Sequence, residues 1–319
     1  VRDLLLNRPI GDIDITTSAP PTVIQDIFDQ VIPVGIEHGT VIVRYHHTSY
    51  EVTTFRIDGE YSDQRHPDSV QFIGQIEQDL QRRDFTINAL AMDRNGHIID
   101  LFKGQEDLQN QLLRTVGDGY HRFTEDPLRI IRALRFSSQL GFRIDDDTLN
   151  SMIEVKKQIE TVAMERITNE FTKLFAGDYV NNGIYYLIHT KVYEHLPILK
   201  GSKHIIHGVA KLTVPFKSFS GVLALFHHLD PSISIQTWVK EWKCSNKIKN
   251  ETIDLVNALK YYKQAGLDPW LVYQLPDHLY SDFVRLIHHV FNDKEIALND
   301  LTTPEESNNP ADYTWSLMP

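Results

Sequence analysis

The chain has 319 residues, of which 41% are hydrophobic and 24% charged, and its formal net charge is −11. This length is enough for two or three domains, and the composition is that of a globular protein. The acidic balance argues against nonspecific binding of nucleic acid, although it leaves room for a local basic face. The single cysteine excludes an intramolecular disulfide and fits a reducing cytoplasm, and no apolar run is long enough to cross a membrane.

Strand and helix patterns alternate up to about residue 113. Residues 12–17, 39–45, 50–56 and 97–102 are rich in β-branched and aromatic side chains and are predicted to be strands. Residues 20–30 open with proline and predict a helix. From about residue 121 the chain turns helical, with apolar spacing near 3.6 residues in 126–140, 146–158 and 164–175. The pattern predicts an α+β fold.

The most informative motif is the alternation of Asp12, Ile13, Asp14 and Ile15. On a strand, the two aspartates point to one face and the two isoleucines point into a core. Two adjacent carboxylates suit Mg²⁺, which binds through one or two carboxylates together with substrate phosphates. This indicates a metal-dependent phosphoryl or nucleotidyl transfer site. The same pattern also occurs in sugar-nucleotide transferases and at solvated strand ends.

Glu51 is a candidate third carboxylate. It lies in the predicted strand 50–56, where alternation places it on the face opposite Val52. A glutamate that merely faces solvent on a strand explains the pattern equally well.

Arginines gather before and within two apolar segments. Arg82 and Arg83 precede one of them, and planar guanidinium groups are natural partners of phosphates and base edges. Asp126, Arg129, Arg132 and Arg135 follow at a spacing of three, which makes them neighbours on a helix surface. A carboxylate and a guanidinium one turn apart can read the edge of an unpaired base. A capped helix start explains Asp126 and the proline after it but not the arginine row.

These motifs, in this order, resemble the class II CCA-adding enzymes, bacterial tRNA nucleotidyltransferases of the polymerase-β-like superfamily. The matching segments are Val1–Leu6 with Gly11–Asp14, Gly35–Val41, Tyr50–Arg56, Tyr61–Pro67, Asp79–Ala89, Asp100–Leu108, Glu125–Arg129 and Met164–Leu174. The resemblance covers residues 1–177, and it identifies residues 59–68, predicted as a mobile loop, with the family's flexible loop.

The resemblance implies a role for each site residue. Asp12 and Asp14 would bind Mg²⁺, Arg2 would contact the nucleotide's phosphates, and Arg83 would lie near the sugar or phosphate. Asp126 and Arg129 would hydrogen-bond the incoming C or A in place of a template strand. Arg132 and Arg135 would complete the nucleotide pocket, while Glu51 stays a candidate third acid on its own pattern.

The resemblance also implies an organisation and a set of partners. The expected domains are a nucleotidyltransferase head at 1–113, N-terminally incomplete, a helical neck at 114–177 that recognises the base, and a helical body at 178–319 without the tail domain. The expected activity adds C, C and A to tRNA 3′ ends from CTP and ATP with Mg²⁺. The partners are tRNA, ATP and CTP, with no membrane and with a homodimer left open. The lysines at 200–217 and 240–263 would then follow the tRNA backbone.

Three alternatives stay open. One is a truncated, catalytically weak fragment that binds tRNA or nucleotide, because the family's glycine pair upstream of Val1-Arg2-Asp3 is not in this sequence. The others are an A-adding relative, which keeps the same motifs, and a poly(A) polymerase relative, which shares the head.

Overall fold

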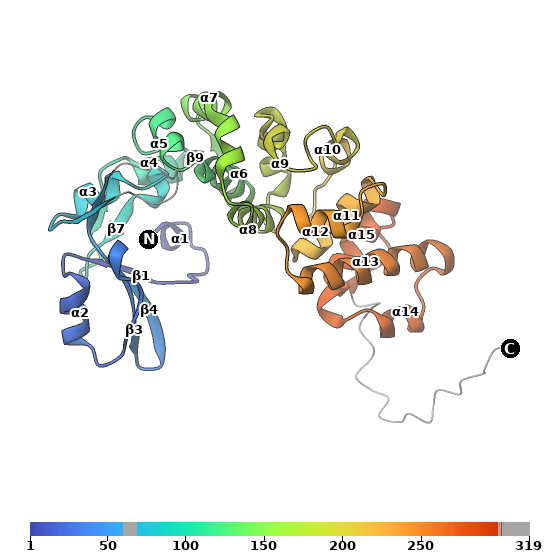
Figure 1. Ribbon diagram of the computed structural model, residues 1–319, viewed down its shortest axis with the longest axis horizontal. Helices are drawn as coiled ribbons and strands as arrows, with labels where there is room; N and C mark the ends of the chain where they lie inside the picture. Colours follow the sequence, from blue (N-terminus) through green and yellow to red (C-terminus); the bar gives the residue numbers. More distant parts are fainter. Residues whose placement is uncertain (60–68, 299–300, 302–319) are drawn as a thin grey trace.

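The computed structural model describes residues 1–59, 69–298 and 301. The molecule is elongated and curved, and the chain runs through it in order, from N-terminal strands at one end to C-terminal helices at the other (Figure 1). This confirms the α+β class, with a mixed head followed by helices. Among the described helices, none is both long and apolar enough to span a membrane.

A four-stranded sheet in the order β1-β4-β3-β2 forms the base of the head. Its strands are β1 (Asp14–Thr17), β2 (Val31–Gly35), β3 (Thr40–Tyr45) and β4 (Thr48–Thr54). β1 runs parallel to β4, and the other two pairs are antiparallel. Short pairs follow: β5 (Arg56–Asp58) with β6 (Val70–Phe72), β7 (Leu90–Met92) with β8 (Ile98–Asp100), and β9 (Leu112–Leu113) with β10 (Arg143–Ile144).

The head contains helices as well as strands, and the rest of the described chain is mainly helical. The head contains α1 (Arg2–Leu5), α2 (Pro21–Ile27), α3 (Ile76–Gln81) and α4 (Gly104–Gln109). The middle contains α5 (Gly119–Glu125), α6 (Leu128–Leu140), α7 (Asp146–Val155), α8 (Met164–Phe175) and α9 (Val180–His189). The last part contains α10 (Lys203–Val209), α11 (Phe219–Leu229), α12 (Ile235–Glu241), α13 (Asn246–Ala265), α14 (Pro269–Gln274) and α15 (Tyr280–Phe291). Side-chain oxygens cap several of these starts, as where Asp118 accepts the N–H of His121.

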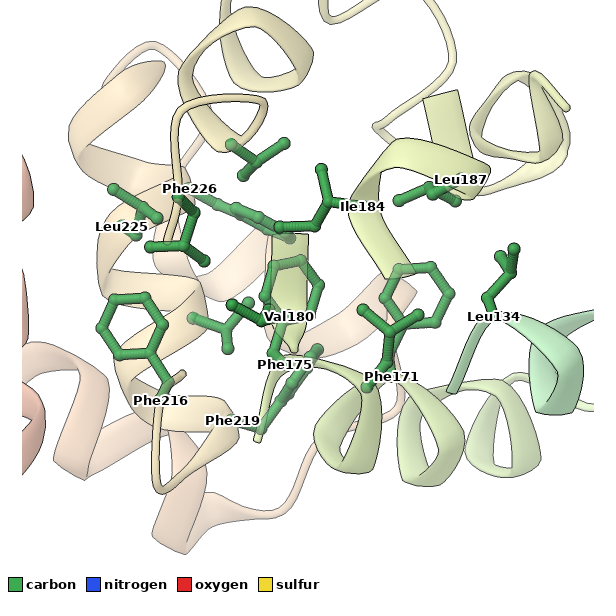
Figure 2. Close-up of a cluster of buried hydrophobic side chains, with 14 of the residues drawn as sticks. Leu134, Phe171, Phe175, Val180, Ile184, Leu187, Phe216, Phe219, Leu225 and Phe226 are labelled. Atoms are coloured by element: carbon green, nitrogen blue, oxygen red, sulfur yellow. The ribbon is translucent and has the colours of Figure 1, made fainter. Parts of the chain in front are cut away.

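Within the described part of the chain, most buried apolar side chains belong to one of two separate cores. A small one joins Ile24 of α2 to Val41, Val43 and Val52 of the sheet. A much larger one begins at Phe85 and continues through the helices to Leu301. Figure 2 shows its centre, where side chains of α6, α8, α9 and α11 interdigitate. Some of its aromatic rings meet edge-on, as in the Phe175–Phe226 pair with centroids 5.7 Å apart, and others are tilted, as in Phe171–Phe175.

One prediction about the sheet is wrong. Ile13 and Ile15 do not point into a core, because their side chains are 60% and 42% exposed. Ile13 precedes the strand, and β1 lies at the edge of the sheet, while α2 packs its Ile24 against β3 and β4. Ile15 shares a face with the buried Val52, its register partner, but α2 does not cover that face as far as Ile15.

Several element boundaries also differ from the predictions. The predicted strand 12–17 begins only at Asp14, and the predicted strand 50–56 divides, since β4 ends at Thr54 and β5 starts at Arg56. The predicted helix 126–140 begins at Leu128, after a break in which Asp126 has an extended backbone. The predicted helix 146–158 ends at Val155 and continues as a 3-10 helix. The predicted loop 59–68 lies outside the described residues except for its first residue.

Candidate active site

The two motif aspartates lie at the free edge of the sheet. Asp14 is the first residue of β1, and Asp12 precedes the strand by two residues. Both are exposed, as is Glu51, which is the register partner of Asp14 on the neighbouring strand. Paired residues on adjacent strands point to the same face, so Asp14 and Glu51 share one face, opposite the buried Val52.

These acids do not form a three-residue cluster. Among the residues that the structure describes, no group of three or more His, Cys, Asp or Glu side chains could hold a metal ion. The edge therefore offers the carboxylates of Asp12 and Asp14, and Glu51 stays a prediction.

Arg2 connects the N-terminus to the segment after α3. Its guanidinium makes two bonds of 3.0 Å to the carboxylate of Asp3 and donates from Nη1 to Oδ1 of Asn88 at 2.8 Å. It also stands over the ring of Phe136, 5.1 Å from the centroid. The predicted phosphate-binding arginine is thus held beside residues 84–88 and α6.

Asp84 and Arg132 form a largely buried ion pair between the head and α6. Nε and Nη2 of Arg132 lie 2.8 and 2.7 Å from Oδ2 of Asp84, whose other oxygen accepts the N–H of Phe85 and the amide of Asn88. Burial alone raises the pKa of Asp84, but Arg132 and Asn88 outweigh it, and the pKa lies below its usual value. The same pairing raises the pKa of Arg132 against the effect of burial.

Arg135 is more deeply buried than the sequence suggested. Its Nε lies 2.5 Å from Oε2 of Glu170 on α8, and Nη1 donates to Gln139. Burial, opposed by Glu170, lowers the pKa of Arg135. The side chain of Arg135 is only 10% exposed, and its guanidinium lies over the ring of Phe136 and not at an open surface. Its role in a nucleotide pocket stays a prediction.

Arg83 is held by an acid that was not among the predicted site residues. Nη2 of Arg83 donates to Oδ2 of Asp79 at 3.1 Å, and Arg82 binds the other oxygen of the same carboxylate. Asp79 is fully buried and also accepts the N–H of Arg56, at 3.3 Å. The spacing of three and four residues from Asp79 to the two arginines is the signal that could have found it.

Asp126 lies in the break between α5 and α6, and a distant arginine binds it. Nη1 and Nη2 of Arg166 on α8 lie 3.3 and 2.8 Å from its Oδ1 and Oδ2. The N–H of Leu128 donates to Oδ1 at 3.2 Å. The side chains of Asp126 and Arg166 are 14% and 23% exposed, so the pair is partly open to solvent.

Arg129 lies one turn further on and has its own counter-charge. Its Nη1 contacts Oε2 of Glu125 at 2.6 Å and the carbonyl of Arg122 at 2.9 Å. Nη2 reaches the carbonyl of Arg82 at 3.4 Å. The base-reading candidate on α6 thereby touches the arginine pair of the head.

The structure brings the predicted residues together in two groups. Asp12 and Asp14 stand on the edge of the sheet, and the arginines with Asp126 line the junction of the head with α5, α6 and α8. Sequence reasoning placed the partners of these residues in its motifs but assigned them no individual role; they are Asp79, Asp84, Asn88, Glu125, Arg166 and Glu170.

Two family models match the chain. The model described as the poly A polymerase head domain matches residues 1–114, and the one described as the probable RNA and SrmB-binding site of polymerase A matches residues 141–202. The CCA-adding enzyme of Oceanobacillus iheyensis is 55% identical over 289 residues, which are 90% of this chain and 72% of that protein. The CCA-adding enzyme of Enterococcus faecalis is 40% identical over 93% of this chain and 74% of its own length.

The chain belongs to the CCA-adding enzymes. The crystal structure of the Bacillus stearothermophilus CCA-adding enzyme in complex with CTP agrees, with a TM-score of 0.80 and 34% identity over 94% of this chain and 73% of that one. CCA-adding enzymes are tRNA nucleotidyltransferases, and enzymes of this family use a divalent metal ion. The family is the one that the motifs predicted, and it is favoured over the polymerase and fragment alternatives.

Proposed function

We propose that this chain adds C, C and A, one after another and without a nucleic-acid template, to the 3′ ends of tRNA from CTP and ATP. The 3′-hydroxyl attacks the α-phosphate, a new P–O bond forms, and pyrophosphate leaves. The observation that supports this best is the arrangement at the start of α6: an acceptor, Asp126, just before the helix and a donor, Arg129, in its first turn are held by different partners.

The donor set at the sheet edge fits Mg²⁺. Asp12 and Asp14 are exposed carboxylates, and Mg²⁺ prefers hard oxygen ligands from one or two carboxylates, completed by water and substrate phosphates. Asp12 and Asp14 would hold this ion, and when bound it would supply activation of the attacking hydroxyl and neutralisation of charge on the triphosphate. Glu51 on the neighbouring strand is proposed as a further acid on the same face.

The remaining residues bind and orient the nucleotide. Arg2 and Arg83 are proposed to contact the triphosphate and sugar, since guanidinium groups match phosphate oxygens in pairs. Asp126 and Arg129 accept from and donate to the base edge, and Arg132 and Arg135 complete the pocket from behind. The body lysines at 200–217 and 240–263 supply positive charge for the tRNA backbone, and the activity is cytoplasmic.

The test incubates the chain with tRNA that lacks its CCA end, Mg²⁺ and labelled CTP and ATP. Addition of three residues in the order C, C, A supports the proposal. Addition of A alone, or of a long A tail, would identify an A-adding enzyme or a polymerase instead. No incorporation despite intact nucleotide binding would refute the proposal for this chain.

The proposed role of Asp126 in recognising the base can be tested with a variant of that residue. Asp126→Ala should abolish the choice among nucleotides while sparing metal binding, because Asp126 is remote in sequence from the sheet edge and pairs with Arg166 on α8. Asp147→Ala, which removes an exposed aspartate from α7, is the matched control and should leave selection intact. Selection of CTP and ATP that survived in Asp126→Ala would show the assignment to be wrong.

A further inference from the structure

Asp126 and Arg129 carry opposite charges one turn apart but do not pair with each other. Side chains three residues apart at the start of a helix are within reach of an ion pair. Such a pair would use up the acceptor and the donor that the base needs. The structure instead gives each a different partner, Arg166 for the aspartate and Glu125 for the arginine.

Arg166 holds the Asp126 carboxylate from a helix that begins 36 residues after α6 begins. Its two bonds, 3.3 Å to Oδ1 and 2.8 Å to Oδ2, form a fork that fixes both the position and the plane of the carboxylate. The N–H of Leu128 at 3.2 Å adds a third bond from the start of α6. The orientation of Asp126 is therefore set by α8 as well as by the start of α6.

These bonds leave the Asp126 carboxylate with a countable number of free hydrogen-bond acceptor positions. A carboxylate has about four acceptor positions, two on each oxygen. Arg166 and Leu128 use both positions on Oδ1, and Arg166 uses one on Oδ2. One acceptor position on Oδ2 stays available, and it suits a single N–H donor.

We propose that Arg166 is a positioning residue for nucleotide selection: it keeps Asp126 away from Arg129 and aims the remaining acceptor of Oδ2 at the amino group of the incoming base. Cytosine and adenine carry an exocyclic amino group there, whereas uracil and guanine carry a carbonyl oxygen that a carboxylate repels. The inference rests on the proposed function. It adds that the choice against uracil and guanine depends on a residue of α8 that does not touch the base.

The decisive variant is Arg166→Met, which keeps a long stem and removes the guanidinium. Without it, Asp126 is free to pair with Arg129, so the KM for CTP should rise. The ratio of kcat/KM for CTP to that for UTP should fall roughly tenfold to a hundredfold, the size of one base-edge contact. A role in folding alone would lower both rates in proportion and leave that ratio unchanged.

Three companion variants separate the explanations. Arg166→Lys keeps a point charge but loses the fork, and should restore part of the ratio. Arg143→Met removes an exposed arginine from β10 and should change neither rate. In an Asp126→Ala background, Arg166→Met should cause no further fall in the ratio, because Arg166 acts through Asp126.

An unchanged CTP-to-UTP ratio in Arg166→Met, or a fall in the double variant equal to the product of the single falls, would overturn the inference. Failure of the proposed function looks different, since the unaltered chain would then incorporate nothing. In that case selection is measured as the ratio of Kd for CTP and UTP by titration calorimetry, and the same fall is expected in Arg166→Met.

Discussion

The ion pair between Asp84 and Arg132 allows a quantitative test of how the head is joined to α6. Arg132→Met removes contacts of 2.8 and 2.7 Å to Asp84 and a weaker one of 3.8 Å to Glu170. The Asp84 side chain is 9% exposed and keeps only the N–H of Phe85 and the amide of Asn88 as donors. The variant therefore leaves a nearly buried carboxylate without its counter-charge.

Breaking a buried pair by removing one partner costs about 3–5 kcal/mol. The Arg132 side chain is 32% exposed, so water compensates part of the loss, and the lower end, about 3 kcal/mol, is expected. The unfolding entropy is about 2.1 cal/mol/K per residue, so a chain of 319 residues shifts by about 1.5 °C per kcal/mol, and the melting temperature should fall by roughly 4–5 °C.

The measurement is thermal unfolding followed by circular dichroism, for the single variants and for Asp84→Asn with Arg132→Met together. Removing both charges should cost less than the sum of the single changes, because no uncompensated carboxylate remains. The asparagine can still accept the N–H of Phe85. Costs that simply add, or a fall of less than 2 °C in Arg132→Met, would refute the reasoning.

Three other predictions concern the metal site, a close contact and pH. Asp12→Asn and Asp14→Asn should each abolish incorporation but change stability by no more than about 0.5 kcal/mol, because both side chains are exposed; a large loss of stability would show a structural role. Gly104→Ala should lower the free energy of unfolding, measured in urea, by about 1–3 kcal/mol, because the added Cβ would lie 2.3 Å from the carbonyl oxygen of Thr86. An unchanged urea midpoint would contradict this. The pKa of Asp84 is lower in the folded chain than in the unfolded chain, so its stabilisation is complete well above pH 4 and is lost as the pH falls. Asp84→Asn should flatten the decline in stability between about pH 5 and pH 3, and an equally steep decline in the variant would count against it.

Many helices and strands could be predicted from the sequence, because their patterns depend only on residues that are close together in the chain. The helix predicted at 164–175 has those bounds in the structure, and the alternation in β4 leaves Glu51 exposed and Val52 buried as expected. Alternation failed at Ile13 and Ile15 because it tells which face a residue shares and not whether that face is covered.

The partners of the site residues could not be predicted in the same way. Arg166 meets Asp126 across 40 residues, and Arg132 meets Asp84 across 48. The first pair exists only once α8 has packed beside α6, and the second only once α6 has packed against the segment after α3; no spacing rule reaches that far. Asp79 is the exception, because it lies within one turn of Arg82 and Arg83.

The two separate cores have a consequence for substrate binding. Among the described residues, the core at the sheet that carries Asp14 has only four buried apolar members, three in the sheet and Ile24 on α2, whereas Leu128 and Ile130, the neighbours of Arg129, belong to the larger core. A unit with so few buried contacts opens at a lower free energy than the whole chain, so amides of β1, β3 and β4 should exchange with solvent before those of α6. With the roles proposed for Asp14 and Arg129, a nucleotide would be held by its phosphates at the sheet and by its base at the start of α6, and would span both units. Ordering of the sheet and capture of the nucleotide are then one coupled equilibrium, and substrate should slow exchange most in the strands.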